Sequence, residues 1–157
     1  MIPELQGYAL MFRTTHSLFH RALEGLTPAQ ALERREEANP VLWIAAHMVT
    51  VRASFAKGIG AHVKVEWSKH FARGGEVKDE ACWPTLAEVR GKWDEVHAAF
   101  MAQMETLDSA HVMAKTQVPG LDDTLLGALG LAALHDAYHV GQLAAARRLH
   151  GLDRIVG

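Results

Sequence analysis

The sequence predicts an all-α protein, a four-helix bundle with a long connection between its second and third long helices. Apolar residues recur at helical spacing in four long segments, and the last three of these begin with a pattern typical of a helix start. No segment shows the alternation of polar and apolar residues that marks a strand. A chain of 157 residues is expected to form one domain, residues 1–157.

The first long helix is predicted over residues 3–25. Residues at helical spacing mark its inward face: Leu5, Phe12, His16, Phe19 and Leu23. Thr27 followed by Pro28 is typical of a helix start, because threonine can cap a free backbone N–H and proline at the first position loses no hydrogen bond. A short helix is therefore predicted from Pro28 to about Arg35.

The second long helix is predicted over residues 40–57, because Asn39-Pro40 repeats the helix-start signal. Gly58 and Gly60 end it. The connection that follows contains Gly74-Gly75 and Trp83-Pro84. It is too long for a tight turn, so we expect it either to cross the bundle or to cover part of it.

The third long helix is predicted to begin after Thr85 and to reach about Leu107, because Thr85 and Glu88 have the spacing of a capping box. The fourth is predicted to run to His150, with Gly151 ending it. Three residues could cap its start: Asp122, Asp123 or Thr124.

Composition narrows the class of protein. Hydrophobic residues make up 49% of the chain and charged residues 22%, as in ordinary soluble proteins. The formal net charge is −2 and the basic residues do not cluster, which argues against nucleic acid as a partner. The single cysteine, Cys82, excludes an internal disulfide and fits a reducing compartment. Without a secretion signal or a long apolar run, the protein is expected to be cytoplasmic, with no membrane partner.

His135 and His139 are the most informative residues of the sequence. They are four residues apart in the fourth helix, so both lie on one face, about 6 Å apart along the axis. Two imidazoles that face a core lose solvation, and they repel each other if both are protonated. A divalent cation relieves both costs, because neutral imidazole is a good ligand. The pair predicts a metal site, with two hydrogen-bonded core histidines as the alternative.

A third histidine, His47, also points into the predicted bundle, since it shares its face with Trp43 and Val51. Taken alone it is better explained as a core histidine bonded to a carbonyl or carboxylate. Gln142 lies one turn beyond His139 on the same face. We expect it either to support a ligand or to contact substrate, and an amide bonded to a neighbouring helix is the alternative.

Every other long helix directs at least one histidine inward, and spacing alone does not say which of them meet. His16 and His20 are four residues apart in the first helix, and His97 faces inward from the third. A di-iron bundle needs two Glu-x-x-His motifs, whereas the nearest match here is the single Asp94-x-x-His97. Four further histidines are predicted to face solvent: His62, His70, His111 and His150.

Small residues occupy the fourth helix on the face opposite the histidine pair: Ala133, Ala137, Gly141 and Ala144. Between Thr124 and Ala146 the only charged side chain of this helix is Asp136. A solvated face would carry Lys, Glu or Arg, so this helix is expected to be covered on most sides. We predict a subunit interface along it and hence a homodimer.

Two motifs together resemble the DinB/YfiT-like family. One is Asn39-Pro40-Val41-Leu42-Trp43-Ile44-Ala45-Ala46-His47-Met48, and the other is His135-Asp136-Ala137-Tyr138-His139-Val140-Gly141-Gln142-Leu143. Members have one histidine late in the first pattern and an HxxxH followed by a Gly-Gln pair in the second. The order of the four helices is similar as well, so the resemblance covers most of the chain.

The resemblance implies an up-down-down-up bundle, often dimeric, with His47, His135 and His139 as a metal-binding triad. His16, His20 and His97 have no counterpart among the usual ligands, and His16 is left as an extra ligand or a substrate contact. Characterised relatives are mainly transferases or isomerases that use bacillithiol, mycothiol or a glutathione-like thiol. Nothing in the sequence identifies which low-molecular-weight thiol, if any, this chain would use.

Three histidine ligands leave a divalent ion with an open position, as in catalytic sites. Zinc or nickel suits imidazole best, and iron or manganese stays open. The first hypothesis is a metal-dependent enzyme, a thiol S-transferase or a hydrolase, acting on a small electrophilic substrate. The second is a non-catalytic metal-binding dimer in stress protection or sensing. The third is a helical interaction module whose histidines are only hydrogen-bonded.

Overall fold

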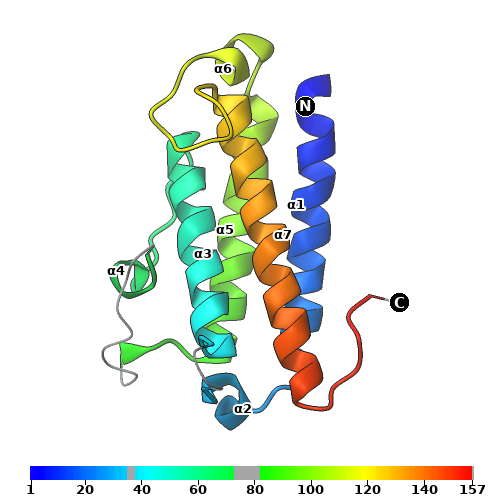
Figure 1. The fold of residues 1–157 in the computed structure, drawn as a ribbon. Helices are drawn as coiled ribbons and strands as arrows, with labels where there is room; N and C mark the ends of the chain where they lie inside the picture. The colour runs from blue at the N-terminus through cyan, green and yellow to red at the C-terminus, as the bar shows by residue number, and fades with distance from the viewer. Residues whose placement is uncertain (35–37, 73–81, 157) are drawn as a thin grey trace.

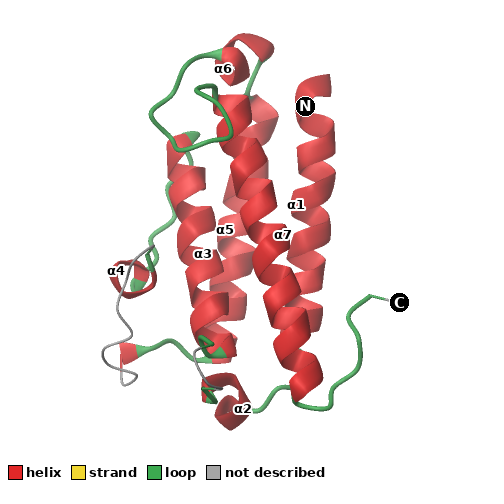
Figure 2. Ribbon diagram, in the orientation of Figure 1, coloured by secondary structure: helices red, strands yellow, loops and turns green. Residues whose placement is uncertain are grey.

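Four long helices make up most of the structure, a computed structural model that describes residues 1–34, 38–72 and 82–156. They are α1 (Pro3–Leu23), α3 (Val41–Gly58), α5 (Leu86–Thr106) and α7 (Leu125–Leu149) (Figure 1). Three short helices connect them: α2 (Pro28–Leu32), α4 (Ser68–Phe71) and α6 (Ser109–Met113). The described residues form no strand, only an isolated bridge between Lys115 and Thr124 (Figure 2). The prediction of an all-α fold is confirmed.

The predicted helix starts follow from local capping. Thr27 and Thr85 each form a capping box, with Gln30 and Glu88 as their respective partners. Thr124, one of the three predicted candidates, caps α7 by accepting a hydrogen bond from the backbone of residue 127. The four long helices end within two residues of the predicted positions.

The short helix α2 is shorter than predicted. It ends at Leu32, whereas the sequence predicted a helix to about Arg35, a residue that lies outside the described part of the chain. The five residues after Leu32 are all charged, so a further turn would have no apolar side chain to bury. Neither α4 nor α6 was predicted. The α4 helix lies in the long connection, and its buried Phe71 packs in the core cluster that includes α3 residues.

The contacts between helices form a closed ring. The α7 helix packs against α1 and α3, and α5 packs against the same two helices. Figure 1 shows that α3 and α5 run in one direction and that α1 and α7 run in the other. Two neighbouring helices are therefore antiparallel at the α3–α7 interface, where the candidate metal ligands lie.

A polar layer divides the core. The guanidinium of Arg52, on α3, donates to Asp136 on α7, to Thr15 Oγ1 on α1 (3.2 Å) and to His97 Nδ1 on α5 (3.0 Å). It also lies over the ring of Trp93, 4.0 Å from the centroid. The buried Arg52 of α3 thus forms a hydrogen bond with one residue from each of the other three long helices. One apolar cluster lies on the α2 side of this layer and a second on the α6 side.

The exposed residues of α7 between Leu134 and Ala145 are uncharged, whereas Arg148 follows them on the same helix. Leu134 and Tyr138 are 55% and 61% exposed, and Ala137 and Gly141 beside them are exposed too. The chain itself therefore does not cover this outer face of α7. Among the described helices, none is both long and apolar enough to cross a membrane.

Candidate metal centre

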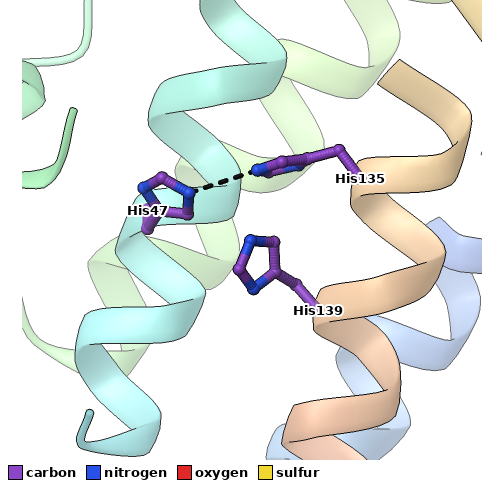
Figure 3. A group of neighbouring side chains, drawn as sticks. All are labelled: His47, His135 and His139. Atoms are coloured by element: carbon purple, nitrogen blue, oxygen red, sulfur yellow. Dashed lines mark hydrogen bonds between the residues drawn. The ribbon is translucent and has the colours of Figure 1, made fainter. Parts of the chain in front are cut away.

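Three imidazoles converge where α3 and α7 cross. His47 projects from α3, and His135 and His139 project from successive turns of α7 toward it (Figure 3). One nitrogen of each ring lies within 4.8 Å of the other two. His47 Nε2 and His135 Nε2 are 3.1 Å apart. Two nitrogens held by a tetrahedral ion at the usual Zn–N distance would be about 3.4 Å apart, so little movement is needed to share one.

The tautomer of His47 is set by the connection that follows α3. Its Nδ1 lies 2.6 Å from the backbone carbonyl oxygen of Phe71, which can only accept a hydrogen bond. The proton of the neutral ring is therefore on Nδ1, and the lone pair is on Nε2, on the side of the triad. Trp43 stacks on the ring with 5.0 Å between centroids and 9° between planes, which fixes its orientation.

His139 is oriented in the same way by the next turn of its own helix. Its Nδ1 donates to Gln142 Oε1 over 2.7 Å, while Gln142 Nε2 donates to the hydroxyl of Tyr138 (3.1 Å). The proton on Nδ1 again leaves Nε2 with a lone pair. Gln142 therefore lies where the sequence placed it, one turn from His139, and contacts the ring from behind, as groups that orient metal ligands commonly do.

His135 differs because its Nδ1 is buried and has no hydrogen-bond partner among the described residues. The nearest carboxylate oxygen, Asp136 Oδ1, is 3.7 Å away, which is too far for a hydrogen bond. The 3.1 Å contact with His47 is a hydrogen bond, and because His47 Nε2 carries no proton, His135 Nε2 is its donor. The carboxylate beside Nδ1 would stabilise the other tautomer of His135, the one that turns a lone pair toward the triad.

The three rings therefore suit a bound cation. All three turn Nε2 inward, and acceptors behind Nδ1 leave the lone pairs of His47 and His139 on Nε2. The proton between His47 and His135 is on His135 Nε2, and a divalent ion could replace it while His135 takes its other tautomer, with Nδ1 protonated beside the carboxylate.

Burial keeps two of these rings in the ligand form. Desolvation lowers the pKa of His47, although its hydrogen bond to Phe71 opposes the shift. Desolvation, with repulsion from His135, lowers the pKa of His139 to about 4. Both rings are consequently neutral at pH 7, so protons compete weakly for their nitrogens.

A cavity of about 490 Å³ adjoins the three histidines. Its wall is mostly apolar, with contributions from α3, α7 and the loop before α7. The residues around the triad include Val51, Phe55, Val118, Pro119, Leu131 and Tyr138. A small ligand in this cavity would reach the triad from its open side.

His16 is not part of this triad. It lies between α1 and α5 with His20 and Asp94, in a second group whose ligand atoms are within 4.8 Å of one another. His20 Nδ1 accepts from Arg90 (3.4 Å), so its proton is on Nε2 and is donated to Asp94 Oδ1 (2.6 Å). Protons thus satisfy His20 and Asp94 without an ion, whereas the buried Nδ1 of His16 has no hydrogen-bond partner among the described residues. His16 Nε2 lies 3.3 Å from the same oxygen.

The third inward histidine belongs to the polar layer. His97 stacks on His16 with 3.9 Å between ring centroids and accepts a hydrogen bond from Arg52. Its Nδ1 is occupied by a donor, so the Asp94-x-x-His97 match does not form a di-iron ligand pair here. His16, His20 and His97 together connect α1 to α5 rather than to the triad.

The predictions for the remaining histidines are partly wrong. His62 and His111 are exposed, as predicted, but His70 is half-buried. The side chain of His150 is only 5% exposed, with its Nδ1 3.6 Å from a carboxylate oxygen of Glu33. The chain turns back after α7 and buries Ile155 in the core beside Val140.

Sequence reasoning missed three contributors to the site: the carbonyl of Phe71, the hydroxyl of Tyr138 and the carboxylate of Asp136. The first comes from a connection whose path is not encoded locally. Asp136 had a signal, because it is the only charged side chain in a long stretch of α7. A lone charge in a buried helix is retained only where it has a partner.

Comparison with known proteins agrees with this geometry. The family model described as the DinB superfamily matches residues 11–143 of the chain. The match contains all three triad histidines and Gln142. Comparison with curated proteins and with solved structures gives no match. Because the family model covers most of the chain, the protein belongs to the DinB superfamily.

Proposed function

We propose that this protein is a divalent-metal-dependent enzyme that acts on a small electrophilic substrate, either as a thiol S-transferase or as a hydrolase. His47, His135 and His139 would hold the ion through Nε2. One observation supports this most strongly: the three rings converge, and acceptors behind two of them leave the Nε2 lone pairs of His47 and His139 directed at the same point. A structural pair of histidines would not need that arrangement.

The ligand set suits zinc or nickel best, with iron and manganese as further candidates. When bound, such an ion would lower the pKa of a thiol or a water molecule at its open position. The protein itself would orient the ligand rings and exclude water from the site. Phe71 and Gln142 hold two ligand rings in place, and the apolar cavity wall keeps bulk water from the reacting group.

We further propose the family's up-down-down-up topology for the single domain, which the helix directions in Figure 1 support. A homodimer through the outer face of α7 is also proposed, because its exposed residues between Leu134 and Ala145 are uncharged. This face equally supports the alternative function, a non-catalytic metal-binding dimer in stress protection or sensing. The dimer alone does not separate the two functions.

Two measurements test the proposal in sequence. The first is the metal content of purified protein by elemental analysis, with His135→Ala and with His111→Ala as a control at an exposed histidine. We expect about one ion per chain in the control and a large loss in His135→Ala. If the protein holds no divalent ion, or if both variants hold equal amounts of metal, the helical interaction module is the remaining hypothesis.

The second measurement is turnover of an electrophilic probe with a panel of low-molecular-weight thiols and with water alone. Turnover that requires a thiol and disappears in His47→Ala supports the transferase. Turnover without thiol supports the hydrolase. A fully metal-loaded protein with no turnover on any probe would favour the non-catalytic alternative.

A further inference from the structure

A second pocket of about 630 Å³ adjoins the cavity at the triad. The two share a wall made by Thr50, Ser54 and Ala72. Along α3, residues 47, 50, 54 and 57 lie on one face, so the wall leads from His47 to Lys57. Ten residues of helix span about 15 Å along the axis, which is the reach of a small elongated molecule.

The second pocket is basic, although the protein as a whole is slightly acidic. Lys57, Lys64 and Lys69 line it, together with His62, and no acidic residue among the described ones does. The formal net charge of the chain is −2. The positive charge at this pocket is therefore a local feature that the overall composition does not explain.

These three lysines also differ from the other lysines in the described residues. Lys92 is paired with Glu95 at 2.7 Å, and Lys115 is paired with Asp123 at 2.7 Å. None of the three pocket lysines has an ion-pair partner within the described residues. Every described lysine without a carboxylate partner thus lines one pocket, next to the triad.

We propose that this pocket binds the anionic end of the molecule whose reactive end reaches the triad. The inference rests on the proposed function and adds a substrate class to it: an elongated molecule with an apolar or reactive head and a carboxylate or phosphate tail. Lysine ammonium groups attract either anion as point charges, without the fork geometry of arginine. The apolar cavity at the triad takes the head, and the lysines take the tail.

The test uses the full chain loaded with Co²⁺, whose absorption reports thiolate binding directly. The probes are ω-mercaptoalkanoates of increasing chain length, the uncharged ω-mercaptoalkanols of the same lengths, and the corresponding ω-mercaptoalkyl phosphates. Above a threshold length, we expect the charged thiols to bind on the order of tenfold more tightly than the alcohols. The ratio of carboxylate to phosphate affinity then identifies the preferred tail.

The decisive variant removes all three pocket charges, as Lys57→Met/Lys64→Met/Lys69→Met. The matched control, Arg13→Met/Arg21→Met/Lys115→Met, removes three exposed charges that line neither pocket, so both proteins have the same net charge. We expect the preference for charged thiols to disappear in the pocket variant alone, with unchanged Co²⁺ content. The preference should also weaken as salt is added.

The possible outcomes separate the two proposals. If Co²⁺ and thiols bind but charged and uncharged probes bind equally at every length, the pocket assignment is wrong and the metal centre stands. Equal loss of preference in both triple variants would likewise overturn the pocket, since only net charge would matter. If no Co²⁺ binds, the metal centre fails, and the assignment of this pocket fails with it.

Discussion

Asp136 of α7 accepts a hydrogen bond from Arg52 of α3, and both side chains are almost completely buried, at 2% and 1% exposure. The pair lies in the layer where Thr15 and His97 also contact the guanidinium, so it connects all four long helices. Asp136 directly follows the triad residue His135, and its other carboxylate oxygen faces that ring. One carboxylate therefore serves both the packing of the bundle and the electrostatics of the candidate metal centre.

We predict that Asp136→Ala destabilises the protein by about 3–5 kcal/mol, because it leaves a buried guanidinium without its counterion. Urea unfolding of the metal-free protein measures the change. Asp123→Ala, which removes an exposed ion pair with Lys115, is the control and should cost less than about 1 kcal/mol.

The double variant Arg52→Met/Asp136→Leu separates charge from packing. It removes both charges and keeps apolar volume, so it should regain most of the stability lost in Asp136→Ala. If the double variant is as unstable as the single one, the loss does not come from an unpaired charge, and the hydrogen bonds of Arg52 to Thr15 and His97 would carry the stability instead.

Gln142→Ala is predicted to weaken divalent-metal binding about 10-fold to 100-fold, because His139 loses the acceptor that fixes its tautomer. Competition against a chromogenic chelator gives the affinity. Gln142→Glu retains an oxygen that accepts from Nδ1 and should restore binding. Gln103→Ala, at a glutamine whose side chain donates a hydrogen bond to Thr106 on α5 and is not part of the triad, serves as a control. Equal affinity in Gln142→Ala and the control would show that this contact does not support the ligand.

The sequence predicted the long helices well because their signals are local. Thr27, Thr85 and Thr124 cap helices through backbone groups only a few residues away. The short helix α4 was missed for the opposite reason. The α4 helix has four residues, and its Phe71 is fully buried, so it depends on packing rather than on its own propensity.

The candidate site was predicted only in part. His135 and His139 follow from helical spacing alone, whereas the inclusion of His47 rested on its apolar setting and on the resemblance. Spacing could not show that His47 meets them, because that depends on how α3 packs against α7. His150 was predicted as exposed because a helix end usually is, but its side chain is buried beside Glu33, which follows α2.

A pH dependence of stability is predicted from His97. Burial, with repulsion from His16 and Arg52, lowers its pKa from 6.5 to about 3. Between these values the unfolded chain binds a proton that the folded chain does not, so the free energy of unfolding falls as the pH falls. The neutral ring makes its full contribution to the free energy of unfolding above about pH 6.5, and this contribution is lost as the pH falls toward 3.

His97→Gln removes this titration and keeps an oxygen that can accept from Arg52. Unfolding free energies of the metal-free proteins, measured across that pH window, should fall more steeply for the wild type than for the variant. The difference should be on the order of 2 kcal/mol at the acid end, since the ring is only partly buried. His111→Gln, at an exposed site, should follow the wild type. Parallel curves for wild type and His97→Gln would contradict the assignment.

The proposed dimer predicts that a charged substitution at Leu134 changes the oligomeric state of the protein. This side chain and Tyr138 are 55% and 61% exposed, and small neighbours at Ala137 and Gly141 let a second helix approach closely. A buried aspartate at such an interface would lack a partner, so Leu134→Asp should give a monomer by sedimentation at concentrations where the wild type is a dimer. Met113→Asp changes a similarly exposed residue on α6, 56% exposed, and should leave the dimer intact. A wild-type monomer at every concentration, or dissociation in both variants, would exclude α7 as the interface and leave its exposed apolar side chains without an explanation.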